Sequence, residues 1–118
     1  MTTDKYKSLF TDHVNYIKHA TEYCRENKLR MLCVTHHPPT NQVFRTKPMS
    51  AKKDKFKSLY YSNLDELLEK DKVHTWVCGH VHSNFDFVTD GGTRVIGNQK
   101  GKPKDKIEDF CNNFVIEL

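Results

Sequence analysis

Two short apolar runs constrain the fold of this chain more than any other feature of its sequence. They are LRMLCVT at 29–35 and HTWVCG at 74–79, and both are bounded by polar residues. A short apolar run of this kind is typical of a strand that is buried in a sheet. Strands of this type occur mostly in sheets that helices cover, so the runs favour an α/β fold.

The residues around these runs predict the helices. Apolar residues recur at helical spacing from 4 to about 27 and predict one amphipathic helix there. The segment SNLDELLEKDK at 62–72 predicts a second helix, with Ser62 as its N-cap. Three leucines of that segment are expected to face inward: Leu64, Leu67 and Leu68.

The remaining segments predict a long loop and more strands. Pro38 and Pro39 stiffen a loop that runs from 36 to 54. Residues 84–98 predict a hairpin that turns at Asp90-Gly91-Gly92, and NFVIEL at 113–118 predicts a last strand. The expected order is helix, strand, helix, strand, hairpin and strand. This order indicates one α/β domain over residues 1–118, with a mixed sheet.

Composition favours an intracellular protein with reduced thiols, or a virion component. The chain has 36% apolar and 29% charged residues, and no apolar run approaches the length needed to span a bilayer. Its start, MTTDKYKSLF, does not resemble a signal peptide. The four cysteines form no Cys-x-x-Cys pair, and two of them, Cys33 and Cys78, fall inside the apolar runs. Buried thiols are therefore expected instead of a disulfide framework.

The charge of the chain suits a partner or substrate that carries phosphate. The formal net charge is +4, and many of the lysines lie in two stretches, at 47–57 and 100–106. A solvated loop would also explain such stretches. Aromatic residues do not alternate with these lysines in a recognisable platform, so nucleic-acid binding stays open but is not indicated.

Histidine pairs follow both predicted buried strands. His36 and His37 come after the first, and His80 and His82 come after the second, beyond Gly79. If residues 80–82 are extended, His80 and His82 point to the same side. Ligands bind at the carboxyl ends of strands in open α/β sheets, and neutral imidazoles are common metal ligands. Seven histidines in 118 residues will sometimes fall close together, but two pairs at strand ends favour a metal site.

The motifs VTHHPP at 34–39 and GHVH at 79–82 resemble the last two metal motifs of the calcineurin-like metallophosphoesterases. The tail FDFVTDGGTRVIGNQKGKP resembles the hairpin and Asn-x-x-Gly loop that follow in smaller members. The resemblance covers nearly the whole chain but only the C-terminal half of the family domain. It implies part of a β-sandwich with flanking helices, and hydrolysis of phosphate esters at two bridged divalent ions (manganese, zinc or iron).

The resemblance also assigns roles to residues of this chain. His36 and His80 resemble ligands of one ion, and His82 resembles a ligand of the other. Three further residues are expected to support the loop or the ligands: His37, Pro38 and Gly79. Pro38 would hold the loop that carries His36. Asn98 belongs to the Asn-x-x-Gly loop.

The earlier motifs of the family do not occur in this sequence. They are Asp-x-His, Gly-Asp-x-x-Asp and Gly-Asn-His, which supply the bridging carboxylate, an asparagine ligand and a proton donor. Without a carboxylate, three neutral imidazoles carry no negative charge to hold two cations together. The chain alone is therefore expected to be inactive and to hold at most one ion weakly.

Three hypotheses follow from these observations. The chain is the C-terminal part of a phosphoesterase that needs a complementary N-terminal half, or it is a non-catalytic relic of the fold that acts within a larger assembly. The third is an unrelated domain with a lone three-histidine site. The sequence leaves the substrate open.

Overall fold

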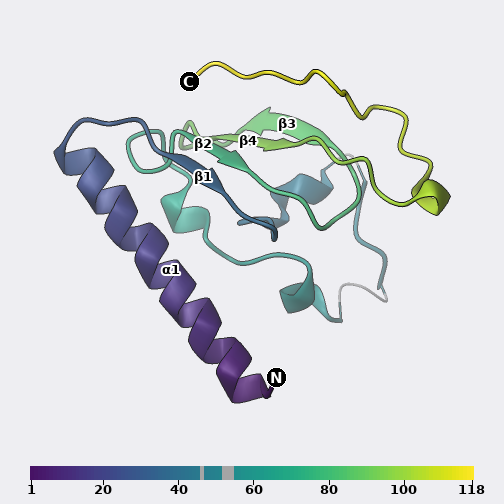
Figure 1. Ribbon diagram of the computed structural model, residues 1–118, viewed down its shortest axis with the longest axis horizontal. Helices are drawn as coiled ribbons and strands as arrows, with labels where there is room; N and C mark the ends of the chain where they lie inside the picture. The colour runs from purple at the N-terminus through teal and green to yellow at the C-terminus, as the bar shows by residue number, and fades with distance from the viewer. Residues whose placement is uncertain (46, 52–54) are drawn as a thin grey trace.

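The computed structural model of this protein describes residues 1–45, 47–51 and 55–118. The predicted loop at 36–54 and the basic stretch at 47–57 include residues 46 and 52–54, so these parts of the two predictions lie outside the described residues. The described part contains one long helix and a mixed four-stranded sheet, which is an α/β arrangement in the broad sense (Figure 1).

The long helix α1 spans Thr3–Glu26, as the apolar periodicity predicted. Thr2 caps its start, because the Thr2 side chain accepts a hydrogen bond from the backbone N–H of Lys5 at 3.2 Å. Only its second half packs on the core, through Val14, Ile17, Ala20 and Cys24. The first half extends away from the sheet, and large apolar side chains there remain partly exposed (Figure 1).

The sheet has the strand order β1-β2-β4-β3. Strands β1 (Leu32–Val34), β2 (Thr75–Val77) and β4 (Arg94–Gly97) run parallel, and β3 (Phe85–Val88) pairs antiparallel with β4. The two apolar runs therefore form neighbouring parallel strands, although each strand is shorter than its run. The hairpin is also confirmed.

The two faces of the sheet differ in burial. Residues paired across strands point to the same face, so Cys33, Trp76 and Val95 lie together, and all three are buried in the core. On the opposite face, Val34 keeps 68% of its surface exposed and Val88 keeps 60%. The sheet thus has one buried face and one face that is partly open to solvent.

The predicted helix at 62–72 is wrong. The segment forms only a 3₁₀ turn at Asp65–Leu67. The N–H groups of Ser62 and Leu64, near its start, donate to the carbonyls of Pro38 and Pro39, both at 2.8 Å. Further along, the N–H of Lys70, which a helix would direct to the carbonyl of Glu66, donates to the carbonyl of Gly91 at 2.9 Å. The three leucines nevertheless face inward as predicted: Leu64, Leu67 and Leu68. Burial of the leucines and the hydrogen bond from Lys70 to Gly91 replace helical bonding.

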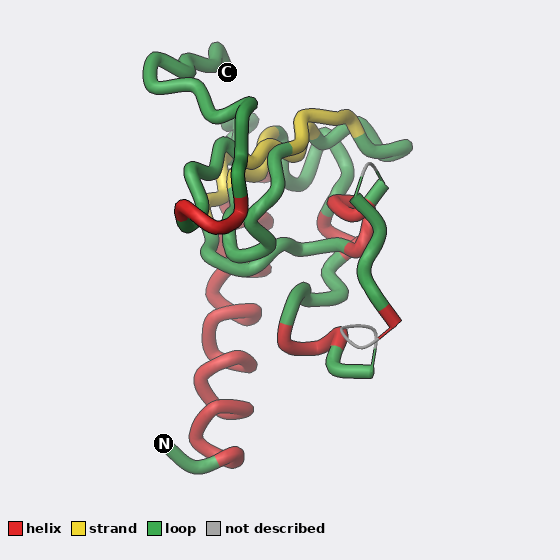
Figure 2. Tube along the Cα trace, turned by 90° about the vertical axis from the view of Figure 1, so that its right-hand side faces the viewer, coloured by secondary structure: helices red, strands yellow, loops and turns green. Residues whose placement is uncertain are grey.

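The predicted strand at 113–118 is wrong as well. These residues form no ladder with any described strand, and Val115 is 82% exposed. The C-terminal segment passes beside the sheet, away from the first turns of α1, and ends where Arg30 Nη1 donates to the carbonyl of Leu118 at 2.5 Å (Figures 1 and 2). Apolar and β-branched residues favour a strand, but a strand forms only where its backbone pairs with another strand.

Within the described ranges, no helix has both the length and the apolar character needed to cross a membrane.

Candidate metal centre

The sheet topology brings the first residues of both histidine pairs together. Strands β1 and β2 are parallel neighbours, so their carboxyl ends meet at one edge of the sheet. His36 follows β1 and His80 follows β2. The backbone N–H of Gly79 donates to the carbonyl of His36 at 2.9 Å and ties the two loops to each other.

Three imidazoles form the histidine cluster: His36, His37 and His80. One ring nitrogen from each lies within 4.8 Å of the others. The shortest separation is 3.0 Å, between His36 Nε2 and His80 Nδ1. That distance is a hydrogen-bond length, so the two rings are hydrogen bonded to each other. Two nitrogens that bind one tetrahedral zinc ion at about 2.0–2.1 Å lie about 3.3 Å apart, so a small separation of the pair would admit an ion.

A backbone carbonyl orients His80. Its Nε2 lies 2.8 Å from the carbonyl of Leu59 and must carry the proton of that hydrogen bond. In the neutral ring, the lone pair then resides on Nδ1, the nitrogen that faces His36. Metal-binding histidines are commonly fixed in this way by a carbonyl or carboxylate on the other nitrogen.

Backbone strain accompanies the second histidine motif. His80 has φ of 68° and His82 has φ of 51°, in the left-handed region that non-glycine residues seldom adopt. The expectation of extended residues at 80–82 is therefore wrong, and the two side chains do not alternate as in a strand. Strain of this kind clusters at functional sites, where the surrounding structure must maintain it.

His37 belongs to the cluster, whereas the sequence predicted for it only a supporting role. Its ring centroid lies 4.9 Å from that of His36 and 4.4 Å from that of His80. Burial, and then the nearby His80 and His36, lower the pKa of His37 below its ordinary value. The neutral form, which binds metals, is thereby favoured.

His82 does not belong to this cluster. Its Nδ1 lies 3.0 Å from Asp105 Oδ2, and its backbone N–H donates to the side chain of Gln99 at 2.9 Å. The pKa of Asp105 is lowered, first by the backbone N–H of Lys102 and also by His82. A carboxylate on Nδ1 leaves Nε2 as the available ligand nitrogen of His82.

The supporting residues have different fates. Pro38 is buried and its carbonyl anchors Ser62, as its role in holding the loop requires. Gly79 makes no positive-φ turn, and a Cβ there would meet the carbonyl of His36 at 3.7 Å and Gln99 Oε1 at 3.9 Å, both ordinary contacts. Asn98 bonds to the backbone of Cys111 in both directions, so it holds the C-terminal segment and not the cluster.

Sequence reasoning missed the role of Gln99. Its side chain accepts from the N–H of His82 at 2.9 Å and donates to the carbonyl of Ser83 at 2.6 Å. Its backbone N–H also donates to the side chain of Asn84. Gln99 therefore fixes the loop that carries His82. The only sequence signal was its position in the loop after the hairpin.

The donor set fits one ion of the zinc type. Three imidazoles converge, and no carboxylate of the described residues joins the group. A borderline metal such as zinc accepts three histidine nitrogens and leaves a further position for water or substrate. These three residues could not hold two ions, because neutral imidazoles carry no negative charge to balance the two cations.

Comparison with protein-family models, with curated proteins and with solved structures finds no match to this chain.

Proposed function

We propose that this chain carries part of a divalent-metal phosphoesterase site, with His36, His37 and His80 holding one ion. The observation that supports the proposal most directly is the convergence of His36 Nε2 and His80 Nδ1, 3.0 Å apart, at the carboxyl ends of neighbouring strands. The resemblance of VTHHPP and GHVH to metallophosphoesterase motifs is the reason to propose phosphate esters as substrates and a partial β-sandwich as the fold.

The described residues suggest how the site works. When bound, the ion supplies Lewis acidity toward a phosphoryl oxygen and an acidified water. The Leu59 carbonyl holds His80 in the tautomer that presents Nδ1, and the Gly79–His36 hydrogen bond fixes the loops relative to each other. Asp105 orients His82, which would serve a second ion in a complete site.

A complementary segment is needed for turnover. The missing carboxylate bridge and proton donor would come from an N-terminal half-domain, on the same polypeptide or on another. A non-catalytic role of the same fold within a larger assembly is the second candidate. The partly open face of the sheet fits both candidates, because either partner would cover it.

Metal titration of the whole chain tests the proposal. Isothermal titration with zinc and manganese should give one site, and His36→Ala or His80→Ala should weaken it by at least the roughly 10- to 100-fold that loss of a residue supporting a ligand causes. His13→Ala is the matched control, because His13 is exposed on α1. Affinity that is unchanged in both cluster variants would refute the metal centre.

Activity provides the second readout. We expect negligible hydrolysis of an aryl phosphate by the metal-loaded chain alone. Robust turnover that His80→Ala abolishes would show that the described residues suffice without a carboxylate bridge, and the requirement for a complementary segment would then be wrong.

A further inference from the structure

A cavity of about 360 Å³ lies beside the histidine cluster. Its walls come from the first turns of α1 and from residues 57–63, and His37 completes the lining. His37 thus belongs both to the cavity and to the cluster. The volume lies within the range of small-molecule pockets. A ligand held in this cavity would therefore border the histidines.

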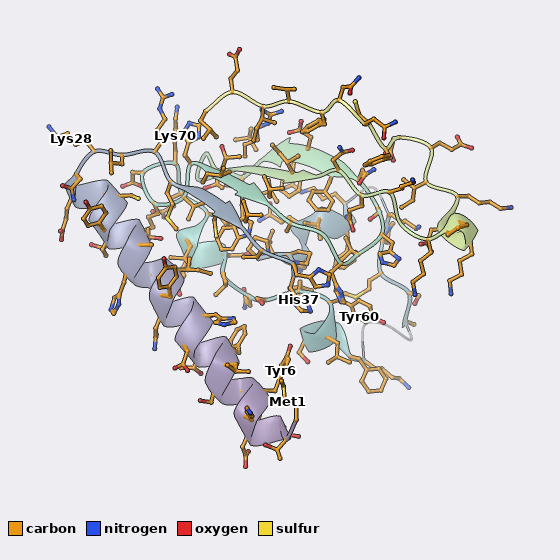
Figure 3. The ribbon with its side chains drawn as sticks, in the orientation of Figure 1. Met1, Tyr6, Lys28, His37, Tyr60 and Lys70 are labelled. Carbon is orange, nitrogen blue, oxygen red and sulfur yellow. The ribbon has the colours of Figure 1, made fainter. Side chains whose placement is uncertain are left out.

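Aromatic rings form much of the cavity wall. Tyr6 and Phe10 lie one helical turn apart on α1, and Tyr61 contributes a third ring. Tyr6 is 48% exposed and Phe10 is 44% exposed, because the first half of α1 extends beyond the core. Figure 3 shows Tyr6 on the side of the helix that faces the segment near Tyr60. Such rings can stack on a planar ligand group.

The polar residues of the cavity favour an anion. Lys7 and Lys57 line it, and none of its lining residues is acidic. Neither lysine forms an ion pair with another residue in the described part of the chain. Three small polar side chains add hydrogen-bonding groups: Ser58, Ser62 and Asn63. The cavity thus combines ring-stacking surfaces with positive charge.

We infer that this cavity binds the planar aromatic part of an organic phosphate and directs its phosphoryl group toward the histidine cluster. The phosphoryl end of this inference rests on the proposed function. The ring-binding part does not, because it depends on Tyr6, Phe10 and Tyr61 and not on a metal ion. Aryl phosphates and nucleotides share this chemistry.

Binding in excess EDTA tests the inference without the metal. The whole chain is titrated with phenyl phosphate, adenosine monophosphate and glycerol phosphate, and binding is followed by saturation-transfer NMR and calorimetry. At least one aromatic phosphate should bind about tenfold more tightly than glycerol phosphate. Binding of phenyl phosphate alone identifies an aryl ester, and binding of adenosine monophosphate alone identifies a nucleotide.

Variants locate the binding. Phe10→Ala should weaken binding of the aromatic phosphate by about threefold to tenfold. Lys7→Gln should also weaken this binding, although it leaves the aromatic side chains of the cavity in place. Tyr16→Ala is the matched control, because Tyr16 is 75% exposed on the same helix and lies outside the cavity lining. Circular dichroism verifies that α1 persists in each variant.

Equal binding of glycerol phosphate, or unchanged affinity in both Phe10→Ala and Lys7→Gln, would overturn the inference. Failure of the metal titration with intact ring binding would refute the proposed function and leave the cavity assignment standing. A successful metal titration without preferential binding of aromatic phosphates would support the metal centre and refute the inference about the cavity.

Discussion

At the residue scale, the buried thiols show how packing sets chemical behaviour. Cys33 and Cys78 lie on neighbouring strands or at their ends, and all four cysteines are free. Burial raises the pKa of Cys33 to about 11. Burial, and then the nearby Cys33, raise that of Cys78 to about 12. Thiolates are the reactive form, so these two cysteines are chemically protected.

Alkylation should therefore distinguish the cysteines. Near pH 7, about one thiol in ten thousand or fewer is ionised at a pKa of about 11, and burial also blocks access. We expect iodoacetamide to modify the exposed Cys111 first, and Cys33 and Cys78 only after unfolding. Peptide mass spectrometry after timed quenching measures this. Cys111→Ser should remove the fast reaction, whereas equally fast labelling of Cys33 would mean that the sheet is open.

The histidine residues show the same dependence on surroundings. His36 and His80 share a cluster because two strands end side by side, while His82 turns to Asp105 because the chain enters the left-handed region after Gly79. Residue type alone predicted that these histidines could bind a metal. The positions of the histidine rings depend on neighbours distant in sequence, such as Leu59 and Gln99.

At the element scale, the hairpin carries a paired charge that can be tested. Arg94 on β4 donates two hydrogen bonds to Asp86 on β3, at 2.9 and 2.7 Å. These bonds lower the pKa of Asp86 below its ordinary value of 3.8. The carboxylate is thus favoured in the folded protein, so the pair stabilises the fold above that ordinary value, and its contribution is lost as the pH falls through the lowered pKa.

Asp86→Asn should lower the free energy of unfolding by about 0.2–1 kcal/mol near neutral pH, because the pair is exposed and screened by solvent. The difference from the unsubstituted chain should shrink between neutral pH and an acid pH below the lowered pKa of Asp86, where the carboxyl group is protonated in the folded and the unfolded state alike. Urea unfolding at both pH values measures it, with Arg94→Gln completing a double-mutant cycle. A difference that grows toward acid pH would contradict the assignment.

At the scale of the whole molecule, one face of the sheet lacks a cover over part of its area. Val34 and Val88 are more than half exposed there, and the C-terminal segment offers further exposed apolar groups, including Val115. Val34 and Val88 lie on the two edge strands, β1 and β3, where a further segment can pair or pack. We therefore expect the chain to associate with a complementary half-domain, with another copy or within an assembly.

Light scattering after size exclusion tests this association. The unsubstituted chain should elute above its monomer mass of 13.9 kDa at high concentration, and Val34→Glu should shift it toward the monomer. Tyr16→Glu is the control, since Tyr16 is exposed on α1 and away from the sheet face. A cooperatively melting monomer with no affinity for an added N-terminal half-domain would remove the case for a divided domain.

The sequence by itself determined the elements that rest on local pattern. The period of the apolar residues predicted α1, the Asp90-Gly91-Gly92 turn predicted the hairpin, and the apolar runs predicted two strands with histidines beyond them. The expected burial of the first strand was wrong, because β1 is an edge strand in which only Cys33 is buried. The other local predictions held. These predictions succeeded because periodicity and turn chemistry act between residues that are close in the chain.

Only the tertiary structure decided the rest. Residues 62–72 met the local pattern of a helix, but the N–H of Lys70 bonded to Gly91 outside the segment. Residues 113–118 had strand composition but pair with neither edge strand of the sheet, β1 or β3. His37 entered the cluster and His82 left it because of contacts with residues 17 to 44 positions away, such as Gln99 and the His36–His80 pair. Hydrogen-bond partners so distant along the chain leave no periodic trace in sequence, so folding alone assigns them.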